Sequence, residues 1–158
     1  MDATLWLLMA AVVGNGLLVG ASLDQVIKQL PARHRIGVVA FSDYSKAGDL
    51  GRGIAWYAAL GIGAALLTVL AAVAGLADPP STQAAAALWL ALLLTGAHSL
   101  TTARAAPLNF SQRAAVGDPA RLAAIFDRFQ RWSTARATLQ VLTLLSVTAA
   151  LAASIAGA

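Results

Sequence analysis

Four long runs of apolar residues alternate along the chain with stretches that contain nearly all the charged side chains. The runs cover roughly residues 4–22, 54–77, 82–103 and 133–156. Each approaches the ~20 residues that an α-helix needs to cross ~30 Å of hydrocarbon. Backbone groups in lipid must bond within their own segment, so helices are the economical structure. The pattern therefore predicts an all-α integral membrane protein with four transmembrane helices.

The composition agrees with this interpretation. The 158 residues are 59% hydrophobic and only 11% charged, whereas an ordinary soluble domain is about half apolar and about a quarter charged. The length fits one domain, residues 1–158. The sequence has no cysteine, which excludes disulfides, thiolate nucleophiles and Cys-ligated metals.

The basic residues predict the orientation of the helices. Residues 23–53 and 104–131 each contain five of the eleven Lys and Arg residues, and the connection 78–81 contains none. Basic loops of membrane proteins stay in the cytoplasm. We therefore expect an up-down four-helix bundle in a bacterial inner membrane, with both termini outside. On this interpretation the net charge of +4 reflects topology and not nucleic-acid binding.

The first run has an alternative interpretation as a signal peptide. Val19-Gly20-Ala21 before Ser22 resembles a small-residue cleavage site. However, Met1-Asp2 lacks the positive charge of a signal peptide, and the apolar run is too long. A transmembrane helix is the preferred interpretation.

Both basic loops have helical patterning of their own. Leu23, Val26, Ile27 and Leu30 follow helical spacing, and Pro31 is expected to end that helix. Asp118 before Pro119 is a typical N-cap. An apolar stripe opposite two arginines follows it, made of Leu122, Ile125, Phe126 and Phe129. We expect amphipathic helices in both cytoplasmic loops, lying along the inner membrane interface.

Every apolar run has one face of polar or small residues at helical spacing. These faces consist of Asn15, Ser22 and Gln25; Gly53, Tyr57, Gly61, Ala64 and Thr68; Thr95, His98, Ser99 and Thr102; and Trp132, Arg136, Gln140 and Thr143. Charged and amide side chains at membrane depth usually face the interior of a bundle. A bundle with these faces turned inward would bring them together.

The depths of the polar residues sharpen this prediction. At 1.5 Å per residue, Tyr57 and Arg136 lie roughly 5 Å from the inner boundary, His98 and Gln140 about 10 Å, and Asn15 about 13 Å. All five therefore fall in the cytoplasmic half of the membrane. We expect a polar pocket open toward the inner leaflet or the cytoplasm. Its mouth would be lined by Thr95–Phe110, which we expect to break at Pro107.

Single residues of this set also have structural explanations. Arg136 could extend to the inner headgroups, and His98 could bridge two helices. Asn15 could simply hold two helices together. Trp132 beside Arg131 could be an interfacial anchor. The convergence of four faces at one depth favours a binding site over these explanations.

The side chains of this pocket suggest proton abstraction. His98 offers a base, Tyr57 a phenol, Asn15 and Gln140 amides, and Arg136 a fixed cation. They would remove a proton from a lipophilic molecule with an acidic C–H or phenolic O–H, and Arg136 would stabilise the resulting anion. Thr102 lies on the His98 face and would contact the ligand. We expect no metal, because His98 has no carboxylate at helical spacing and the other histidine is in a loop.

Three short elements carry a resemblance to a known family. They are D-L-x-x-G-x-x-x-Y (Asp49 to Tyr57), APLNF (Ala106 to Phe110) and R-W-x-x-x-R (Arg131 to Arg136). Together they resemble the anthrone-oxygenase-like group of small four-helix membrane proteins. The resemblance implies oxygenation of polyketide-type anthrones without metal, flavin or other cofactor. It implicates Asn109, Trp132, Arg136 and Tyr57 as site residues.

Two other functions are open at this point. The chain could be a non-catalytic lipid- or quinone-binding accessory subunit of a membrane complex. A small oligomeric transporter is disfavoured, because the outer half has no second polar belt. The expected partners are the bilayer and a lipophilic small molecule, and neither self-association nor a complex partner is decided by the sequence.

Overall fold

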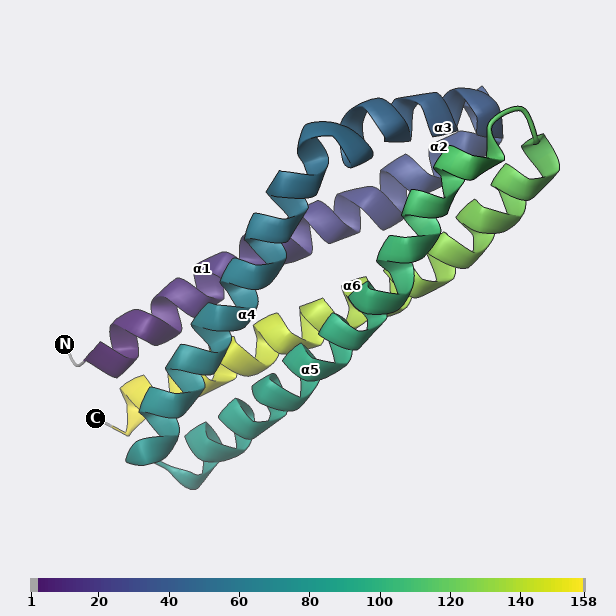
Figure 1. The fold of residues 1–158 in the computed structure, drawn as a ribbon. Coiled ribbons are helices and arrows are strands. Elements are labelled where there is room, and N and C mark those ends of the chain that lie inside the picture. The colour runs from purple at the N-terminus through teal and green to yellow at the C-terminus, as the bar shows by residue number, and fades with distance from the viewer. Residues whose placement is uncertain (1–2, 158) are drawn as a thin grey trace.

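The computed structural model describes residues 3–157, so the Met1-Asp2 pair considered above and Ala158 lie outside the described residues. Within that range the chain is helical and contains no strand. Four long helical stretches follow one another (Figure 1). They comprise α1 (Ala3–Asp24), the π-helical turn η1 (Gln25–Gln29) and α2 (Leu30–Ile36); α3 (Val38–Ala47), the π-helical turn η2 (Gly48–Arg52) and α4 (Gly53–Ala77); α5 (Thr82–Ser111) and the 3-10 turn η3 (Gln112–Ala115); and α6 (Pro119–Ala156).

All four stretches are long and apolar enough to cross a membrane. They contain 34, 40, 34 and 38 residues. At 1.5 Å per residue each is more than about 50 Å long, which exceeds the ~30 Å hydrocarbon core. The prediction of an all-α chain with four such helices is confirmed. Helices of this length and composition are typical of a membrane-embedded protein that contacts lipid.

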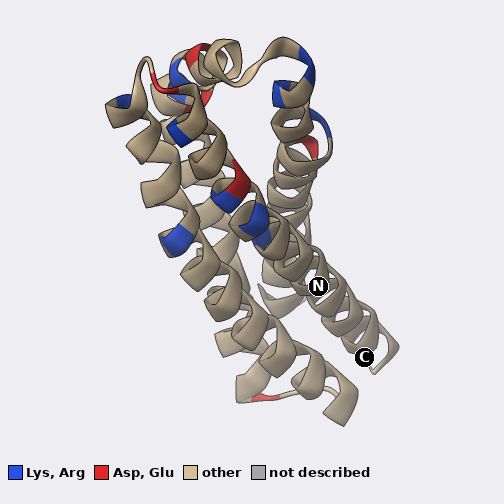
Figure 2. Cartoon of the chain, turned by 90° about the vertical axis from the view of Figure 1, so that its right-hand side faces the viewer, with Lys and Arg blue, Asp and Glu red and all other residues tan. Residues whose placement is uncertain are grey.

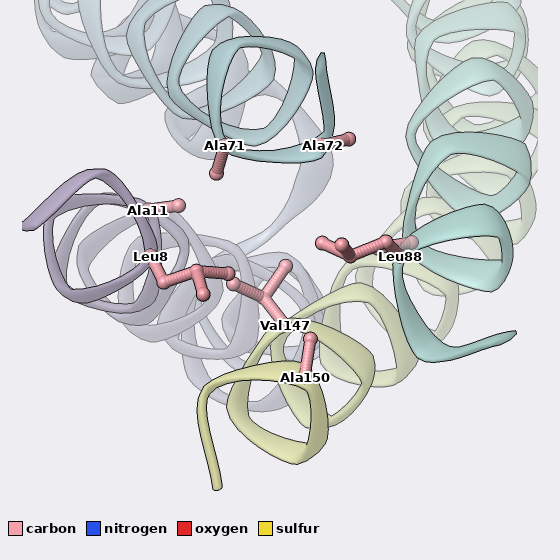
Figure 3. Close-up of a cluster of buried hydrophobic side chains, with 8 residues drawn as sticks. Leu8, Ala11, Ala71, Ala72, Leu88, Val147 and Ala150 are labelled. Carbon is pink, nitrogen blue, oxygen red and sulfur yellow. The ribbon is translucent and has the colours of Figure 1, made fainter. Parts of the chain in front are cut away.

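Each long stretch runs opposite to the one before it, and the two ends of the chain lie together (Figure 1). Helix α1 packs on α4 and α6, and α5 packs on α6 and, less extensively, on α4. Near the chain ends all four helices contribute to one apolar core, which includes Leu8, Ala71, Leu88 and Val147 (Figure 3). Alanines make up much of this core, so the helix backbones can approach closely.

A second apolar core lies at the other end of the molecule. Phe126 of α6 meets Phe41 of α3 edge to face, with ring centroids 4.9 Å apart. Leu30 of α2, together with Leu122 and Phe129 of α6, completes its centre. The apolar stripe that follows Asp118 is therefore packed against residues of α2, α3, α5 and η3. Helix α6 starts at this stripe and continues without a break into the fourth apolar run.

The expected N-cap of α6 is confirmed. The side chain of Asp118 accepts a hydrogen bond from the backbone N–H of Arg121 at 2.9 Å. Pro119 occupies the first turn, where no intrahelical partner for its nitrogen is needed.

Two predicted helix ends are wrong. Pro31 does not end the first stretch, which continues to Ile36 and turns at Gly37 with φ +87°. The π turn just before Pro31 changes the local hydrogen-bond pattern, so the missing proline N–H falls in the first turn of α2. Pro107 likewise lies inside α5, where the flanking Ala105 and Asn109 are buried by neighbouring elements. Tertiary packing of a helix can offset the ~3 kcal/mol that an internal proline costs it.

The charged side chains gather in the half of the molecule away from the chain ends (Figure 2). Arg33, only 7% exposed, ties α2 to α6 in this half through an ion pair with Asp127 at 2.8 Å. The half near the chain ends contains one described charged residue, Asp78, in the turn between α4 and α5. The protein therefore has one apolar end and one charged end.

Candidate functional site

A cavity of about 550 Å³ lies between the helices, on the charged side of the apolar core. This volume is within the ~300–1,000 Å³ typical of small-molecule sites. Most of its wall is apolar, and the polar side chains come from six different elements. The polar lining residues are Ser22, Gln25, Asp49, Tyr57, His98, Ser99, Thr102, Asn109, Arg136 and Gln140.

Three polar side chains in the cavity have atoms without a partner. His98 of α5 is 3% exposed and Gln140 of α6 is 2% exposed. Neither ring nitrogen of His98 has a hydrogen-bond partner within residues 3–157, and the same holds for Gln140 Oε1 and Arg136 Nε. A buried polar atom without a partner costs about 1–3 kcal/mol. Such atoms in a cavity are available to a ligand.

Arg136 is held by one neutral partner. Its Nη2 donates to the side-chain oxygen of Gln25 at 2.7 Å. None of the ion pairs in the described part of the chain includes Arg136. The guanidinium is therefore fixed in position while its charge is not neutralised by a carboxylate.

Tyr57, Thr102 and Asn109 also line the cavity. Tyr57 of α4 is partly buried and lies within electrostatic range of Arg136, as does His98. The structure thus brings six of the eight proposed site residues to one cavity. They are Tyr57, His98, Thr102, Asn109, Arg136 and Gln140.

The other two proposed site residues, Asn15 and Trp132, lie elsewhere. Asn15 is buried between α1 and α4, where its amide donates to Thr68 Oγ1 at 2.9 Å and to the Ala11 carbonyl at 2.8 Å. The cavity lining on α1 begins one turn later, at Leu18. Trp132 is 40% exposed, and the buried position beside it is Ser133. Neither Asn15 nor Trp132 is part of the cavity lining.

Asp49 is a cavity residue that the sequence analysis did not single out as a site residue. Asp49 is the acidic residue among those that line the cavity. Its Oδ2 accepts a hydrogen bond from Ser45 Oγ at 3.0 Å. The π turn η2 and the non-helical Gly51 (φ −93°, ψ −121°) direct the chain here from α3 into α4. The sequence feature that could have pointed to Asp49 is its position in the glycine-rich segment GDLGRG (Gly48–Gly53).

A buried hydrogen-bond network supports Asp49 and Asn109. Gln112, fully buried, donates to Asn109 Oδ1 at 2.7 Å and accepts from Ser42 Oγ at 3.0 Å. It also donates to Ser45 Oγ at 3.2 Å, and Ser45 in turn bonds Asp49. The network links α3, η2, α5 and η3 beside Asp49 and Asn109 of the cavity lining.

Gly53 allows the backbone to close around η2. A Cβ atom at this position would lie 2.7 Å from the Gly48 carbonyl oxygen, closer than real Cβ contacts. Only glycine fits without a shift of the backbone. The start of α4, and with it Tyr57, is therefore positioned by this close approach.

The arrangement combines a base, a fixed cation, a phenol and hydrogen-bonding amides in an otherwise apolar cavity. His98 can accept a proton, and Arg136 can stabilise an anion that forms beside it. No group of three His, Cys, Asp or Glu side chains suited to a metal ion occurs within residues 3–157.

Comparisons of the chain with protein-family models, with curated proteins and with solved structures give no match.

Proposed function

We propose that the cavity binds a lipophilic, aromatic or polyketide-type molecule and oxygenates it without a cofactor, as the anthrone-oxygenase-like resemblance implies. The observation that carries the proposal is the group of unpartnered buried atoms on His98, Arg136 and Gln140 in one cavity. Each has an assignable role: proton acceptor, anion stabiliser and hydrogen-bond acceptor for a hydroxyl group.

Anthrone is a suitable model substrate for this chemistry. His98 removes a proton from the acidic CH₂ carbon, and the electron pair left behind delocalises onto the carbonyl oxygen, where Arg136 stabilises it. The carbanion transfers an electron to O₂, and recombination forms a C–O bond. The resulting peroxide anion takes back the proton held by His98 to give a hydroperoxide at that carbon. Loss of water then gives anthraquinone, so that one anthrone and one O₂ yield one quinone and one H₂O. The carbon is oxidised and the oxygen is reduced.

The same proposal includes a place in the cell. The charged end, with α2, α3 and the first turns of α6, would lie in the cytoplasm and the inner headgroup region of a bacterial inner membrane. Both chain termini would then be outside, and the four long stretches would form an up-down transmembrane bundle. The apolar faces of the helices in the basic loops would pack partly against each other and partly against the membrane interface.

The proposal is tested with purified protein in lipid nanodiscs, using anthrone as substrate. Oxygen uptake and anthraquinone formation are measured against protein-free nanodiscs. Replacement of the base, His98→Ala, is expected to lower the rate by about 10²–10⁴-fold. Arg136→Ala is expected to lower it by about 10²–10³-fold.

Matched variants control this experiment. His34→Ala removes the other histidine, and Arg131→Ala removes an exposed arginine of the same helix. Both should retain the wild-type rate. Equal rates in all four variants and in protein-free nanodiscs would refute catalysis of anthrone oxidation.

The second candidate is a lipid- or quinone-binding accessory subunit. The wide apolar wall of the cavity, which includes Leu18, Ile62 and Leu66, favours it. In that case a phospholipid or quinone should copurify with the protein together with a protein partner, and His98→Ala should change neither.

A further inference from the structure

The cavity has a buried floor and an exposed rim. The lining residues on α1, η1, η2 and α6 are all buried or partly buried. In the described chain, the exposed lining residues all belong to α4 and α5. They are Ile54, Ala58, Ile62 and Leu66 on α4, and Ser99, Thr102 and Phe110 on α5. The cavity therefore opens between α4 and α5, whose contact is the least extensive among adjacent long helices.

The opening is apolar. Ile62 and Leu66 on the α4 side are 62% and 57% exposed. On the α5 side, Ser99 Oγ donates to the Thr95 carbonyl at 2.8 Å, and Thr102 Oγ1 donates to the His98 carbonyl at 2.9 Å. Because both hydroxyls are bonded within their own helix, the rim presents methyl and methylene groups. Ile62 lies within a helical stretch that is long and apolar enough to cross a membrane, which favours an opening toward hydrocarbon over one toward water.

The floor has the opposite character. With a neutral imidazole, the unpartnered atoms of His98, Arg136 and Gln140 offer two N–H donors and two acceptors. A ligand that satisfies them needs both an acceptor oxygen and an O–H group at one end. The apolar walls toward the rim need an apolar body behind that end.

We infer that the cavity takes its ligand sideways from the hydrocarbon layer, through the opening between α4 and α5, polar end first. The ligand is a bilayer-dissolved amphiphile with hydroxyl and carbonyl oxygens at one end and an apolar body. This inference rests on the proposed function only in treating the cavity as the ligand site. The sequence predicted a pocket open toward either the inner leaflet or the cytoplasm. Of these two, the inference selects an opening toward the lipid.

A single engineered thiol tests the route, because the natural chain has no cysteine. Ser22→Cys places it on the floor, where Ser22 is 3% exposed and lines the cavity. The protein is reconstituted in phosphatidylcholine vesicles and labelled with N-dodecylmaleimide or with a sulfonated, membrane-impermeant maleimide. The labelling rate of each reagent is divided by its rate with the control variant Arg128→Cys, whose thiol lies on the charged end. This normalises for the intrinsic reactivity of the reagent.

The lateral route predicts a normalised rate for the dodecyl reagent about tenfold or more above that of the sulfonated one, since its chain partitions into the bilayer with its polar head at one end. Adding Ile62→Trp or Ala58→Trp on the rim should slow the dodecyl reaction severalfold. Leu70→Trp, exposed on the same helix but outside the lining, should not. Circular dichroism and gel filtration confirm that each variant is folded.

Three results would overturn the inference. Ready labelling by the sulfonated reagent would show that the cavity opens to water. An unchanged dodecyl rate in both folded rim variants would show that the ligand path lies elsewhere. Failure of both reagents would show that the opening is covered, for example by a second copy of the chain. Since labelling needs no turnover, these outcomes are independent of whether anthrone is oxidised.

Discussion

The guanidinium of Arg136 on α6 donates a 2.7 Å hydrogen bond to the side-chain oxygen of Gln25, 111 residues earlier in the chain. Gln25 is 4% exposed and belongs to the π turn between α1 and α2. A neutral amide holds the cation in place and leaves its charge available to the cavity. The contact joins the first and last helical stretches at the site.

Replacement of this anchor should separate positioning from charge. On the proposed function, Gln25→Leu is expected to lower anthrone turnover about 10²-fold, since small misplacement of a catalytic group has effects of that size. It should also destabilise the protein by about 1.5–3 kcal/mol, as expected for a lost hydrogen bond to a charged group. Turnover and thermal unfolding in nanodiscs measure the two effects.

Gln25→Glu is the matched variant. It keeps an acceptor for Arg136 but neutralises the cation, so stability should be retained while turnover falls. Wild-type turnover in Gln25→Glu would contradict a role for the free charge of Arg136.

Asn15 should contribute to stability and not to the site. Its bond to Thr68 Oγ1 at 2.9 Å joins α1 to α4. Asn15→Ala is therefore expected to destabilise the protein by about 0.5–2 kcal/mol, the range for interhelical hydrogen bonds in membranes. Thr68→Val should have a similar effect, and the double variant should show coupling between the two. A large loss of turnover in a stably folded Asn15→Ala protein would contradict this assignment.

Gly53 should resist substitution, because a Cβ would lie 2.7 Å from the Gly48 carbonyl oxygen. Gly53→Ala is expected to destabilise the fold by about 1–3 kcal/mol, as overpacking against rigid atoms does. Gly63→Ala on the same helix has no atom within 4 Å of the added Cβ and serves as the control. Equal unfolding temperatures of the two variants would show that the close approach of Gly53 to Gly48 does not constrain the bend at η2.

The network around Gln112 should be required for the polar wall of the cavity. Gln112→Leu leaves Ser42 and Asn109 without their buried partner, with an expected loss of about 2–4 kcal/mol from two unsatisfied groups. Ser111→Ala is the control, because Ser111 bonds only the Leu108 carbonyl of its own helix. Chemical unfolding in mild detergent distinguishes the variants, and equal stabilities would contradict the assigned role.

Helical periodicity predicted the helices and much of the cavity, because apolar runs and polar faces follow directly from residue spacing. It placed Tyr57, His98 and Arg136 on inward faces, and these residues do line one cavity. Trp132 shows the limit of this reasoning. At 3.6 residues per turn, a residue eight positions before Gln140 is rotated about 80° from it. Ser133, seven positions before, is rotated only about 20° and is the buried residue.

Other features depend on contacts that spacing does not contain. Asp49 reaches the cavity because a π turn and the non-helical Gly51 change the helical phase between α3 and α4. Pro31 stays within a helical stretch because the π turn before it places it in the first turn of α2, and Pro107 lies inside α5 between buried neighbours. The start of α6 is amphipathic in sequence, and only tertiary packing shows that residues of α2, α3, α5 and η3 cover its apolar stripe.

The central claim is that polar groups from separate helices meet in a ligand cavity near the charged end. An experimental structure of the protein extracted in native lipid, without added ligand, tests it most directly. We expect elongated density between α4 and α5 whose polar end contacts Arg136 and His98. Imidazole and guanidinium groups on opposite outer surfaces, with aliphatic side chains filling the space between the helices, would contradict the account.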